Sequence, residues 1–208
     1  MAGKSQRRKR PDGELSRERI LDAATEIAAE RGYEGASIAL VSAKCGLPAS
    51  SIYWHFKNKD DLIAAVIGRS FADWTKAWQV PAAGSPRDRL AGMAMQIAKA
   101  LLDSPDFIRL GLMLSLERRP VEPRARAMFL ESRAQTYDQL TETIRGFGPD
   151  LTAAQIHQLV TYAIAGADGL FIAKEIGGDA VDLLALFELH AWALYDTAQR
   201  MIPEGDRR

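Results

Sequence analysis

The segment Ser37–Leu62 constrains the fold of this chain more than any other part of it. Two short stretches with helical apolar spacing flank a glycine. The first runs over Ile38–Ala43, the turn falls at Cys45-Gly46, and the second stretch opens at Pro48. A proline in the first turn of a helix loses no hydrogen bond, because the amide there has no intrahelical partner. The segment therefore predicts two helices joined by a tight turn.

This order is typical of a helix-turn-helix, in which the start of the second helix contacts base edges and the first helix crosses the DNA backbone. Ile52 and Phe56, four residues apart, form the apolar stripe that we expect in the core. The other side chains of the second helix suit a major groove that admits an α-helix. The residues predicted to face DNA are Ala49, Ser50, Ser51, Tyr53 and Trp54.

Base reading by this helix is expected to be sparse. The helix carries no arginine, asparagine or glutamine that could pair bidentately with a base. Serine hydroxyls bond to several bases and discriminate only modestly. We therefore expect sequence readout to depend on apolar contacts with thymine methyl groups and on DNA shape.

Composition places the chain among soluble globular proteins. It has 208 residues, of which 47% are hydrophobic and 26% charged, which suits one large domain or two small ones. The formal net charge is zero, which argues against a nonspecific binder of polyanions. Positive charge gathers at Lys4 and Arg7–Arg10, a run that is either a tail without function or a basic arm for phosphates.

The single cysteine, Cys45, excludes an internal disulfide and is compatible with a reducing cytoplasm. A packed thiol is its simplest interpretation, and a redox switch would need a resolving cysteine that the chain lacks. No apolar core follows the basic N-terminus, and no stretch approaches the roughly 18–20 apolar residues of a membrane span. We therefore predict a soluble, cytoplasmic protein without a membrane segment.

Apolar spacings of three and four predict helices throughout and no strand. The first helix is expected to open at Ser16, after a breaker at Pro11-Asp12-Gly13, and to end at Gly32. Lys59 begins a longer helix that runs to Trp78, and residues 81–86 form the clearest linker. Further helices are predicted at about 86–103, 106–118, 123–147, 152–176 and 179–202, which makes about nine in an all-α fold.

Eight positions of the chain resemble the pattern TxxxVxxxxGxxxxxxYxHFxxKxxL, the N-terminal signature of the TetR family of one-component regulators. The preceding stretch ILDAATEIAAERGYEGAS matches as well, so the resemblance covers about residues 16–66. It implies a basic flexible arm at 1–15, a three-helix DNA-binding domain at 16–62, and a ligand-sensing and dimerisation domain at 63–208. The matching positions are Ser37, Val41, Gly46, Tyr53, His55, Phe56, Lys59 and Leu62.

The resemblance also assigns roles within the helix-turn-helix. Lys59 fits a phosphate contact on physical grounds too, because the amide dipoles of a helix start attract the same anion. A lone histidine beside aromatic residues is more often structural, so a role for His55 rests on the resemblance. The chain has Ala39 where some relatives carry a base-reading arginine, and Pro48 where serine is frequent, so the operator sequence is not predicted. The implied base-facing residues are Ala49, Ser50, Ser51 and Tyr53, and the implied phosphate contacts are Ser37, Tyr53, Trp54, His55 and Lys59.

The last two helices are predicted to form a dimer interface. The helix at 152–176 carries small residues at spacings that let another helix approach closely, and the last helix is apolar nearly all round. The resemblance assigns its dimer bundle to these helices, which implies an isologous four-helix interface. The predicted interface residues are Gly166, Gly169, Phe187, Trp192 and Tyr195.

Aromatic and methionine side chains of the middle helices are core residues on the simplest interpretation. The resemblance implies a cavity among the fourth to eighth helices, and flexible methionines with aromatic rings suit an apolar ligand. The candidate pocket residues are Trp74, Trp78, Phe107, Met113, Met128, Tyr137, Tyr162 and Phe171.

We therefore predict a ligand-responsive DNA-binding repressor that binds a pseudo-palindromic operator as a homodimer and is released by a small, hydrophobic effector. An effector weakens DNA binding when it prefers a geometry that misplaces the recognition helices. The alternatives are an activator or a regulator controlled by a protein partner without a small ligand. An enzyme, a metal site and a cofactor are not expected, because the chain has no nucleophile elbow, metal-ligand cluster or phosphate-binding glycine loop.

Overall fold

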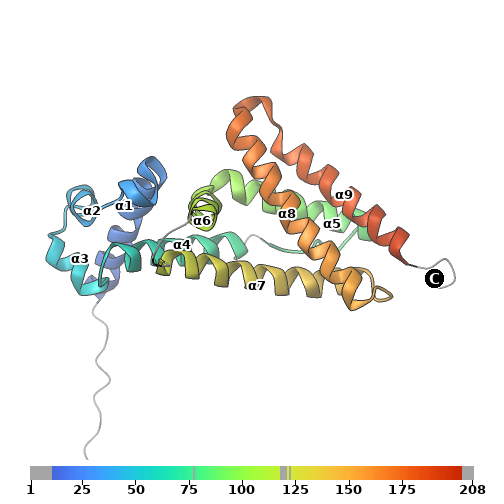
Figure 1. The fold of residues 1–208 in the computed structure, drawn as a ribbon, viewed down its shortest axis with the longest axis horizontal. Coiled ribbons are helices and arrows are strands. Elements are labelled where there is room, and N and C mark those ends of the chain that lie inside the picture. The colour runs from blue at the N-terminus through green and yellow to red at the C-terminus, as the bar shows by residue number, and fades with distance from the viewer. Residues whose placement is uncertain (1–10, 77, 118–120, 122, 203–208) are drawn as a thin grey trace, which may run out of the picture. The chain divides into compact units, whose positions relative to one another are not determined.

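Nine α-helices and one short 3₁₀-helix make up the regular structure of the residues described, with no strand among them (Figure 1). The structure is a computed structural model and describes residues 11–76, 78–117, 121 and 123–202. The predicted all-α fold is confirmed. The elements are α1 (Pro11–Gly35), α2 (Ile38–Cys45), α3 (Ala49–His55), α4 (Lys59–Lys76), α5 (Pro86–Asp103), α6 (Asp106–Leu116), α7 (Arg124–Phe147), α8 (Ala153–Gly177), η1 (Gly178–Ala180) and α9 (Leu183–Met201).

Helix α1 begins earlier than the sequence predicted. It starts at Pro11, so Pro11-Asp12-Gly13 is not a breaker, and Ser16 lies inside the helix rather than at its N-cap. Proline is tolerated there because the first-turn amide has no intrahelical partner to lose. Gly32 ends the regular part of the helix as predicted, with a φ of 67° that only glycine adopts without strain.

Helix α9 begins later than predicted. Residues 178–180 form a 3₁₀ turn, and Asp182 then caps α9 by accepting a hydrogen bond from the backbone N–H of Ala185 at 3.1 Å. Ser85 and Thr152 cap α5 and α8 in the same way, each within a capping box. These side chains satisfy amides that the first turn of a helix leaves without partners.

The chain divides into two compact units. The first unit contains Met1–Ser70 and Asp106–Phe129, and the second contains Phe71–Pro105 and Leu130–Arg208. The sequence placed the boundary between the DNA-binding and sensing domains after residue 62, whereas the first unit extends to Ser70 and also includes α6. The reason is packing, since α6 contacts α1 within this unit. The basic arm was predicted over residues 1–15, but residues 11–15 belong to α1, and the basic residues Lys4 and Arg7–Arg10 lie outside the described residues.

The first unit has a continuous apolar core. Helices α1, α2, α3 and α4 contribute aliphatic side chains with no more than 1% of their surface exposed. Ile52 of α3 is among them, so the short recognition helix is anchored through one side chain at the centre of the unit. The fully buried residues are Ile20, Leu21, Val41, Ile52, Leu62, Ile63 and Ile67.

The second unit is built from α5, α8, α9 and most of α7. One of its apolar clusters contains Leu151, Ile156, Leu159, Val160 and Leu194, with residues of α7 packed on its edge. The start of α8 is joined to the end of α9 by a hydrogen bond from the side-chain amide of Gln155 to the carbonyl of Met201 at 2.8 Å.

Gly111 of α6 lies directly against the ring of Phe129 of α7. A Cβ at this position would lie 2.0 Å from the ring of Phe129. We expect Gly111→Ala to destabilise the protein by about 2–3 kcal/mol, because the ring would have to leave its site in the core. Thermal or urea unfolding followed by circular dichroism would measure the change.

Gly146→Ala is the matched control on α7. A Cβ there meets nothing within 4 Å, so alanine should change stability by less than about 1 kcal/mol, in the stabilising direction. Equal stability of the Gly111→Ala variant and the wild type would show that α6 and α7 do not pack this closely.

Candidate nucleic-acid interface

Helix α3 exposes one face and buries the other. Tyr53 and Trp54 have 56% and 78% of their surfaces exposed, and Ser50 is also exposed. Ile52, between them in sequence, is completely buried. Large aromatic side chains at such exposure are uncommon on a surface without a partner. The exposed face of α3 therefore has the polarity and the aromatic content of a binding surface.

The turn before α3 is held by several independent contacts. Gly46 ends α2 in the left-handed conformation, with a φ of 68°. Arg19 of α1 donates a hydrogen bond to the carbonyl of Cys45 at 2.7 Å, and the hydroxyl of Ser42 donates to the carbonyl of Leu47 at 2.7 Å. Pro48 is the residue immediately before α3 rather than its first helical residue. Together these contacts set the angle at which α3 leaves the turn.

Cys45 itself is a buried thiol within this turn. Its Sγ lies 3.8 Å from the carbonyl of Ser42, which is a weak hydrogen bond from the thiol. Its side chain is only 8% exposed, as expected of a packed thiol.

The predicted DNA contacts are not equally accessible. Ser50, Tyr53 and Trp54 are exposed, whereas Ala49 and Ser51 are half-buried. Ser37 is also half-buried, and its Oγ accepts a hydrogen bond from the N–H of Leu40 at 3.2 Å as the N-cap of α2. A serine hydroxyl that accepts one hydrogen bond still has a proton to donate, so Ser37 can both cap the helix and bond a phosphate.

Lys59 makes intramolecular contacts. Its ammonium donates to the carbonyl of Tyr33 at 3.1 Å, lies 4.5 Å from the centre of the Tyr33 ring, and forms an ion pair with Glu34 at 3.6 Å. Lys59 therefore fastens the start of α4 to the end of α1. The sequence pattern predicted a phosphate contact for Lys59. It did not predict the contacts with Tyr33, because these arise from packing between segments 26 residues apart.

Lys57 was missed by the sequence reasoning. Its side chain is exposed in the three-residue connection between α3 and α4, and its backbone N–H donates to Asp61 at 3.2 Å. A lysine two residues beyond the recognition helix is a simple signal for a phosphate contact. Asn58 follows and caps α4, its side-chain oxygen accepting from the N–H of Asp61 at 2.8 Å.

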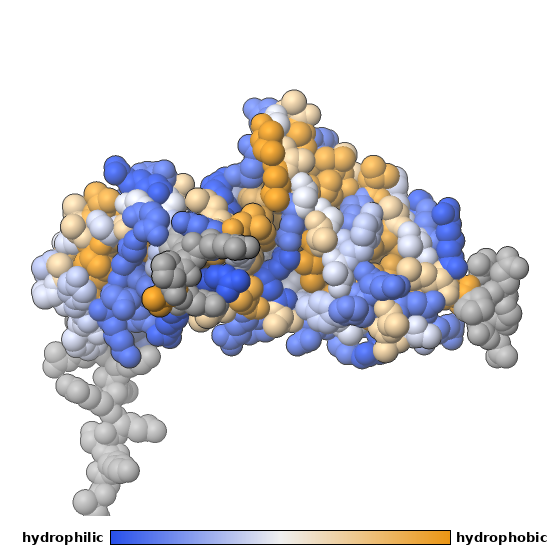
Figure 2. Space-filling model, viewed as in Figure 1, coloured by the Kyte–Doolittle hydropathy of each residue, from blue (hydrophilic) through white to orange (hydrophobic). Residues whose placement is uncertain are grey.

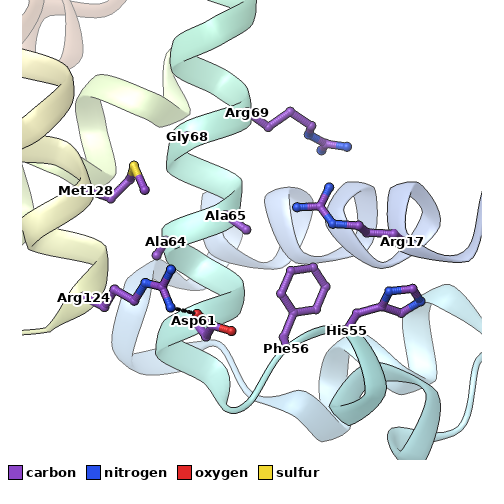
Figure 3. Close-up of a pocket in the computed structure, with 10 residues that line it drawn as sticks. All are labelled: Arg17, His55, Phe56, Asp61, Ala64, Ala65, Gly68, Arg69, Arg124 and Met128. Atoms are coloured by element: carbon purple, nitrogen blue, oxygen red, sulfur yellow. Dashed lines mark hydrogen bonds and ion pairs between the residues drawn. The ribbon is translucent and has the colours of Figure 1, made fainter. Parts of the chain in front are cut away.

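A cleft of about 440 Å³ lies in the first unit behind α3 (Figure 3). Its wall carries Arg17 of α1, whose guanidinium lies 5.4 Å from the centre of the Phe56 ring. The same guanidinium faces His55, and burial together with this charge lowers the pKa of His55 below its usual value. His55 is therefore neutral at pH 7 and adds no positive charge to the interface.

The eight residues predicted to line an effector pocket are divided between the two units. Phe107, Met113 and Met128 belong to the first unit, and the other five belong to the second. Met113 has 51% of its surface exposed and Tyr162 has 59%, so neither lines an enclosed cavity. Within the second unit, the ring centres of Trp74 and Trp78 lie 4.5 Å apart. The hydroxyl of Tyr137 lies 2.6 Å from Nδ1 of His157, which is not one of the eight candidates.

The residues predicted for a dimer interface also separate into two groups. A Cβ on Gly166 would lie 2.3 Å from the ring of His190, so Gly166 serves the packing of α8 on α9 within one chain. Phe187 is 2% exposed and belongs to the core of its own protomer. Trp192 and Tyr195 are half-buried, the former beneath the guanidinium of Arg87 at 4.7 Å. Gly169, by contrast, faces open space.

An exposed stripe runs along α8, and only Gly169 of it is among the predicted interface residues. Figure 2 shows hydrophobic side chains exposed over this helix. Their spacing of three and four residues places them on one face, and that pattern was available in the sequence. The α8 stripe consists of Tyr162, Ala165, Gly169, Ile172 and Ile176.

No group of three or more His, Cys, Asp or Glu side chains that could hold a metal ion occurs among residues 11–76, 78–117, 121 and 123–202.

Residues 20–66 match a family model described as bacterial regulatory proteins, tetR family. The HTH-type transcriptional repressor Rv1353c of Mycobacterium tuberculosis is 34% identical over 103 residues, which are 50% of this chain and 39% of that protein. The class D tetracycline repressor protein of Escherichia coli is 35% identical over 109 residues, which are 52% of this chain and 48% of that protein. The matched part is thus less than half the length of either relative.

Solved structures share the fold over nearly the whole chain. The fatty acid degradation regulator FadR of Bacillus halodurans has a TM-score of 0.71 and 18% identity, and covers 91% of this chain and 97% of its own. FadR of Bacillus subtilis, in complex with stearoyl-CoA, has a TM-score of 0.69 and 18% identity, and covers 86% and 97%. At such identities the likeness shows the fold.

We expect NMR titration to give His55 a pKa below the roughly 6.5 of an unperturbed histidine. Burial is the larger cause and the charge of Arg17 the smaller. Because the folded-state pKa is the lower one, this histidine stabilises the fold above pH ~6.5, and that stability is lost as the pH falls through the lowered pKa. Arg17→Gln should raise the pKa of His55 part of the way back.

Arg31→Gln, which removes an exposed arginine at the other end of α1, is the control and should leave the His55 titration unchanged. A His55 pKa that stays the same in the Arg17→Gln variant would contradict the contact seen in the cleft.

Proposed function

Because the chain belongs to the tetR family of bacterial transcriptional regulators through its residues 20–66, we propose that it represses transcription by binding an operator as a homodimer. The observation that carries this proposal is the exposed face of α3. Ser50, Tyr53 and Trp54 stand on a helix that Ile52 and the Gly46 turn hold rigidly. A helix so held and so exposed is suited to the major groove.

Recognition of DNA would combine phosphate contacts with sparse base reading. Lys57 and Ser37 are placed at the two sides of α3 in sequence, and both have groups that can donate to phosphate. Tyr53 and Trp54 offer apolar ring surfaces to thymine methyl groups and sugars, and Ser50 offers a hydroxyl that several bases accept. Specificity would then depend on DNA shape and on the spacing of the half-sites.

Homodimerisation through the α8 stripe supports a pseudo-palindromic operator. Residues 153–180 are long and apolar enough to cross a membrane by length and composition, yet only 28% of their most apolar window is buried within the protomer. Ile176 and Tyr162 are 83% and 59% exposed. A second copy of the same helix, related by a two-fold axis, would cover this face and leave the packing of each protomer unchanged.

A small hydrophobic effector is the proposed signal. In the second unit Trp74 and Trp78 meet edge to face, and the indole N–H of Trp78 is buried without a hydrogen-bond partner in the described part of the chain. A buried donor of this kind is satisfied when a ligand brings an acceptor. The stearoyl-CoA complex of Bacillus subtilis FadR supports an effector with a long apolar part.

The alternative is an activator or a regulator controlled by a protein partner. Met113 and Tyr162, two of the candidate pocket residues, are 51% and 59% exposed, which favours this alternative over an effector cavity built from all eight. In either case DNA is the partner, and we propose that the protein acts in the cytoplasm.

Lys57→Gln should weaken binding to a duplex that the wild-type protein selects from a random-sequence library. If each Lys57 contacts one phosphate, the slope of log affinity against log salt should fall by about 1 per half-site. Fluorescence anisotropy at several salt concentrations would measure both quantities. Lys76→Gln, which removes an exposed lysine paired only locally with Asp73, is the control and should leave the slope unchanged.

Lys59→Gln tests the second basic residue of the motif in the same assay. Since its ammonium is bound to Tyr33, we expect a lower unfolding temperature and an unchanged salt slope. If the salt slope of the Lys59→Gln variant falls as in the Lys57→Gln variant, Lys59 contacts a phosphate as the sequence pattern predicted. An unchanged slope for Lys57→Gln would remove Lys57 from the interface.

Gly169→Glu should convert the dimer to monomers. A Cβ at Gly169 meets nothing within 4 Å in the protomer, so the added side chain disturbs only a partner. Burial of an unpaired charge at the centre of an apolar interface costs about several kcal/mol, which would greatly weaken the association of the two protomers. Light scattering and sedimentation would report the mass.

Gly146→Glu is the matched control, since Gly146 is equally unobstructed but lies on α7, and it should stay dimeric. Gly166 is unsuitable for this test because a side chain there would collide with His190 of the same chain. A dimeric Gly169→Glu variant would place the interface elsewhere.

A further inference from the structure

Two adjacent carboxylates at the start of α4 bind the first turn of α7. Asp60 and Asp61 follow Lys59, and α7 begins at Arg124, more than sixty positions later in the chain. All of these residues belong to the first unit, which contains α7 up to Phe129. Ala125 is completely buried, so the first turn of α7 is an integral part of that unit.

Asp60 caps α7 from outside the helix. Its carboxylate accepts hydrogen bonds from the backbone N–H of Arg124 at 2.6 Å and of Ala125 at 3.1 Å. The hydroxyl of Tyr33, near the end of α1, donates to the same carboxylate at 3.0 Å. A negative charge at these amides is favourable, because the amides and the helix dipole both present positive charge there. Asp60 thus joins three helices at one point.

Asp61 joins the same turn to the recognition helix. The guanidinium of Arg124 bonds to its Oδ1, as Figure 3 shows. Its Oδ2 accepts from the backbone N–H of Lys57 at 3.2 Å, two residues after α3 ends at His55. The connection between α3 and α4 is only three residues long, so a displacement of the Lys57 backbone would also displace the end of α3. Arg124 and Lys57 therefore share one carboxylate.

Helix α7 has a second bond of this kind in its later part. Arg133 donates from both of its terminal nitrogens to Asp168 of α8, at 2.8 and 2.5 Å. These two residues belong to the second unit, whereas Arg124 belongs to the first. A single continuous helix therefore carries one Arg–Asp pair in each unit. Because bidentate pairs fix geometry as well as distance, α7 is held firmly to α8 on that side.

We propose that Asp60 and Asp61 are positioning residues for DNA binding, because they tie the connection that follows the recognition helix to the first turn of α7. A displacement of α7 would pull on Asp60 and Asp61 and so reorient α3. This inference rests on the proposed DNA-binding function and names the route by which the second unit regulates it. Two alternatives make different predictions: the carboxylates act only as charges near DNA, or Arg124 contacts DNA directly.

The sign of the effect of Asp61→Asn separates positioning from charge. A carboxylate that acts only through its charge repels phosphates, so its neutralisation would strengthen binding. A positioning role requires the opposite, and we expect Asp61→Asn to weaken binding to the library-selected duplex about 5- to 10-fold. The salt dependence should stay that of the wild type, since no phosphate contact is lost. Equal or tighter binding by Asp61→Asn would overturn the inference.

A double-mutant cycle with Arg124→Gln identifies the partner. If Arg124 acts through Asp61, each single variant should show about the same loss, and the double variant should be no weaker than either. If Arg124 instead contacts DNA, its removal should lower the salt slope by about 1 per half-site, and the two losses should multiply. Independent, multiplying losses contradict the inference.

Asp60 gives a second test that does not depend on Asp61. Asparagine keeps only one of the two acceptor oxygens, so it can retain the bonds to Ala125 and Tyr33 but not the bond to Arg124. Asp60→Asn should therefore lose less DNA affinity than Asp60→Ala, which should lose about tenfold. Circular dichroism at the assay temperature confirms that each variant is folded. Equal affinities of the alanine and asparagine variants, both folded, would show that the cap does not position the interface.

Two controls match these changes. Asp73→Asn neutralises an exposed carboxylate on α4, and the pair Glu142→Gln with Arg145→Gln removes an exposed ion pair on α7. Both should bind DNA as the wild type does. A wild-type protein that selects no duplex at all would refute the proposed function, whereas a wild type that binds and an Asp61→Asn variant that binds equally well would refute only the positioning role.

Discussion

The recognition helix α3 depends on the burial of a single side chain, Ile52. The helix has only seven residues, and a helix of that length is not stable in water by itself. Burial of Ile52 at the centre of the first unit, together with the left-handed Gly46 and the bond from Arg19 to Cys45, holds it in place. The exposed rings of Tyr53 and Trp54 can face outward only because this inner side is secured.

Several cations of the helix-turn-helix and of α4 are engaged within the protein. Lys44 pairs with Glu26, Lys59 bonds to Tyr33, and Arg69 bonds to Glu18 and Asp22. Lys57 is exposed beside α3 and makes no ion pair within the described part of the chain. The internal pairs stiffen the unit, and the few outward groups supply the contacts that remain for DNA.

Helix bounds were the most predictable part of the fold, and groupings of distant residues the least. The bounds of α5 follow from Ser85, Pro86 and the apolar spacing, all within one stretch of chain. The pocket candidates Phe107 and Met113 lie on α6, which packs on α1 in the first unit, a contact that no local pattern predicted. The exposed α8 stripe could have been found from its spacing of three and four residues. The sequence reasoning instead assigned Gly166 and Gly169 of α8 together to the dimer interface, because the sequence does not show which of them α9 covers. Gly166 is covered by His190, and Gly169 is not.

The sequence by itself determined the helical class and the helix-turn-helix, because caps, glycine turns and apolar spacing act over a few residues. Only the tertiary structure decided which partner each functional side chain has. Lys59 meets Tyr33 across 26 positions, and Asp60 meets Arg124 and Ala125 across 64 and 65. The sequence signature at Ser37–Leu62 contains none of these partners, so it does not predict the contacts of Lys59 and Asp60. Contacts of this range arise when helices pack, since close packing of the core brings together side chains that no local pattern relates.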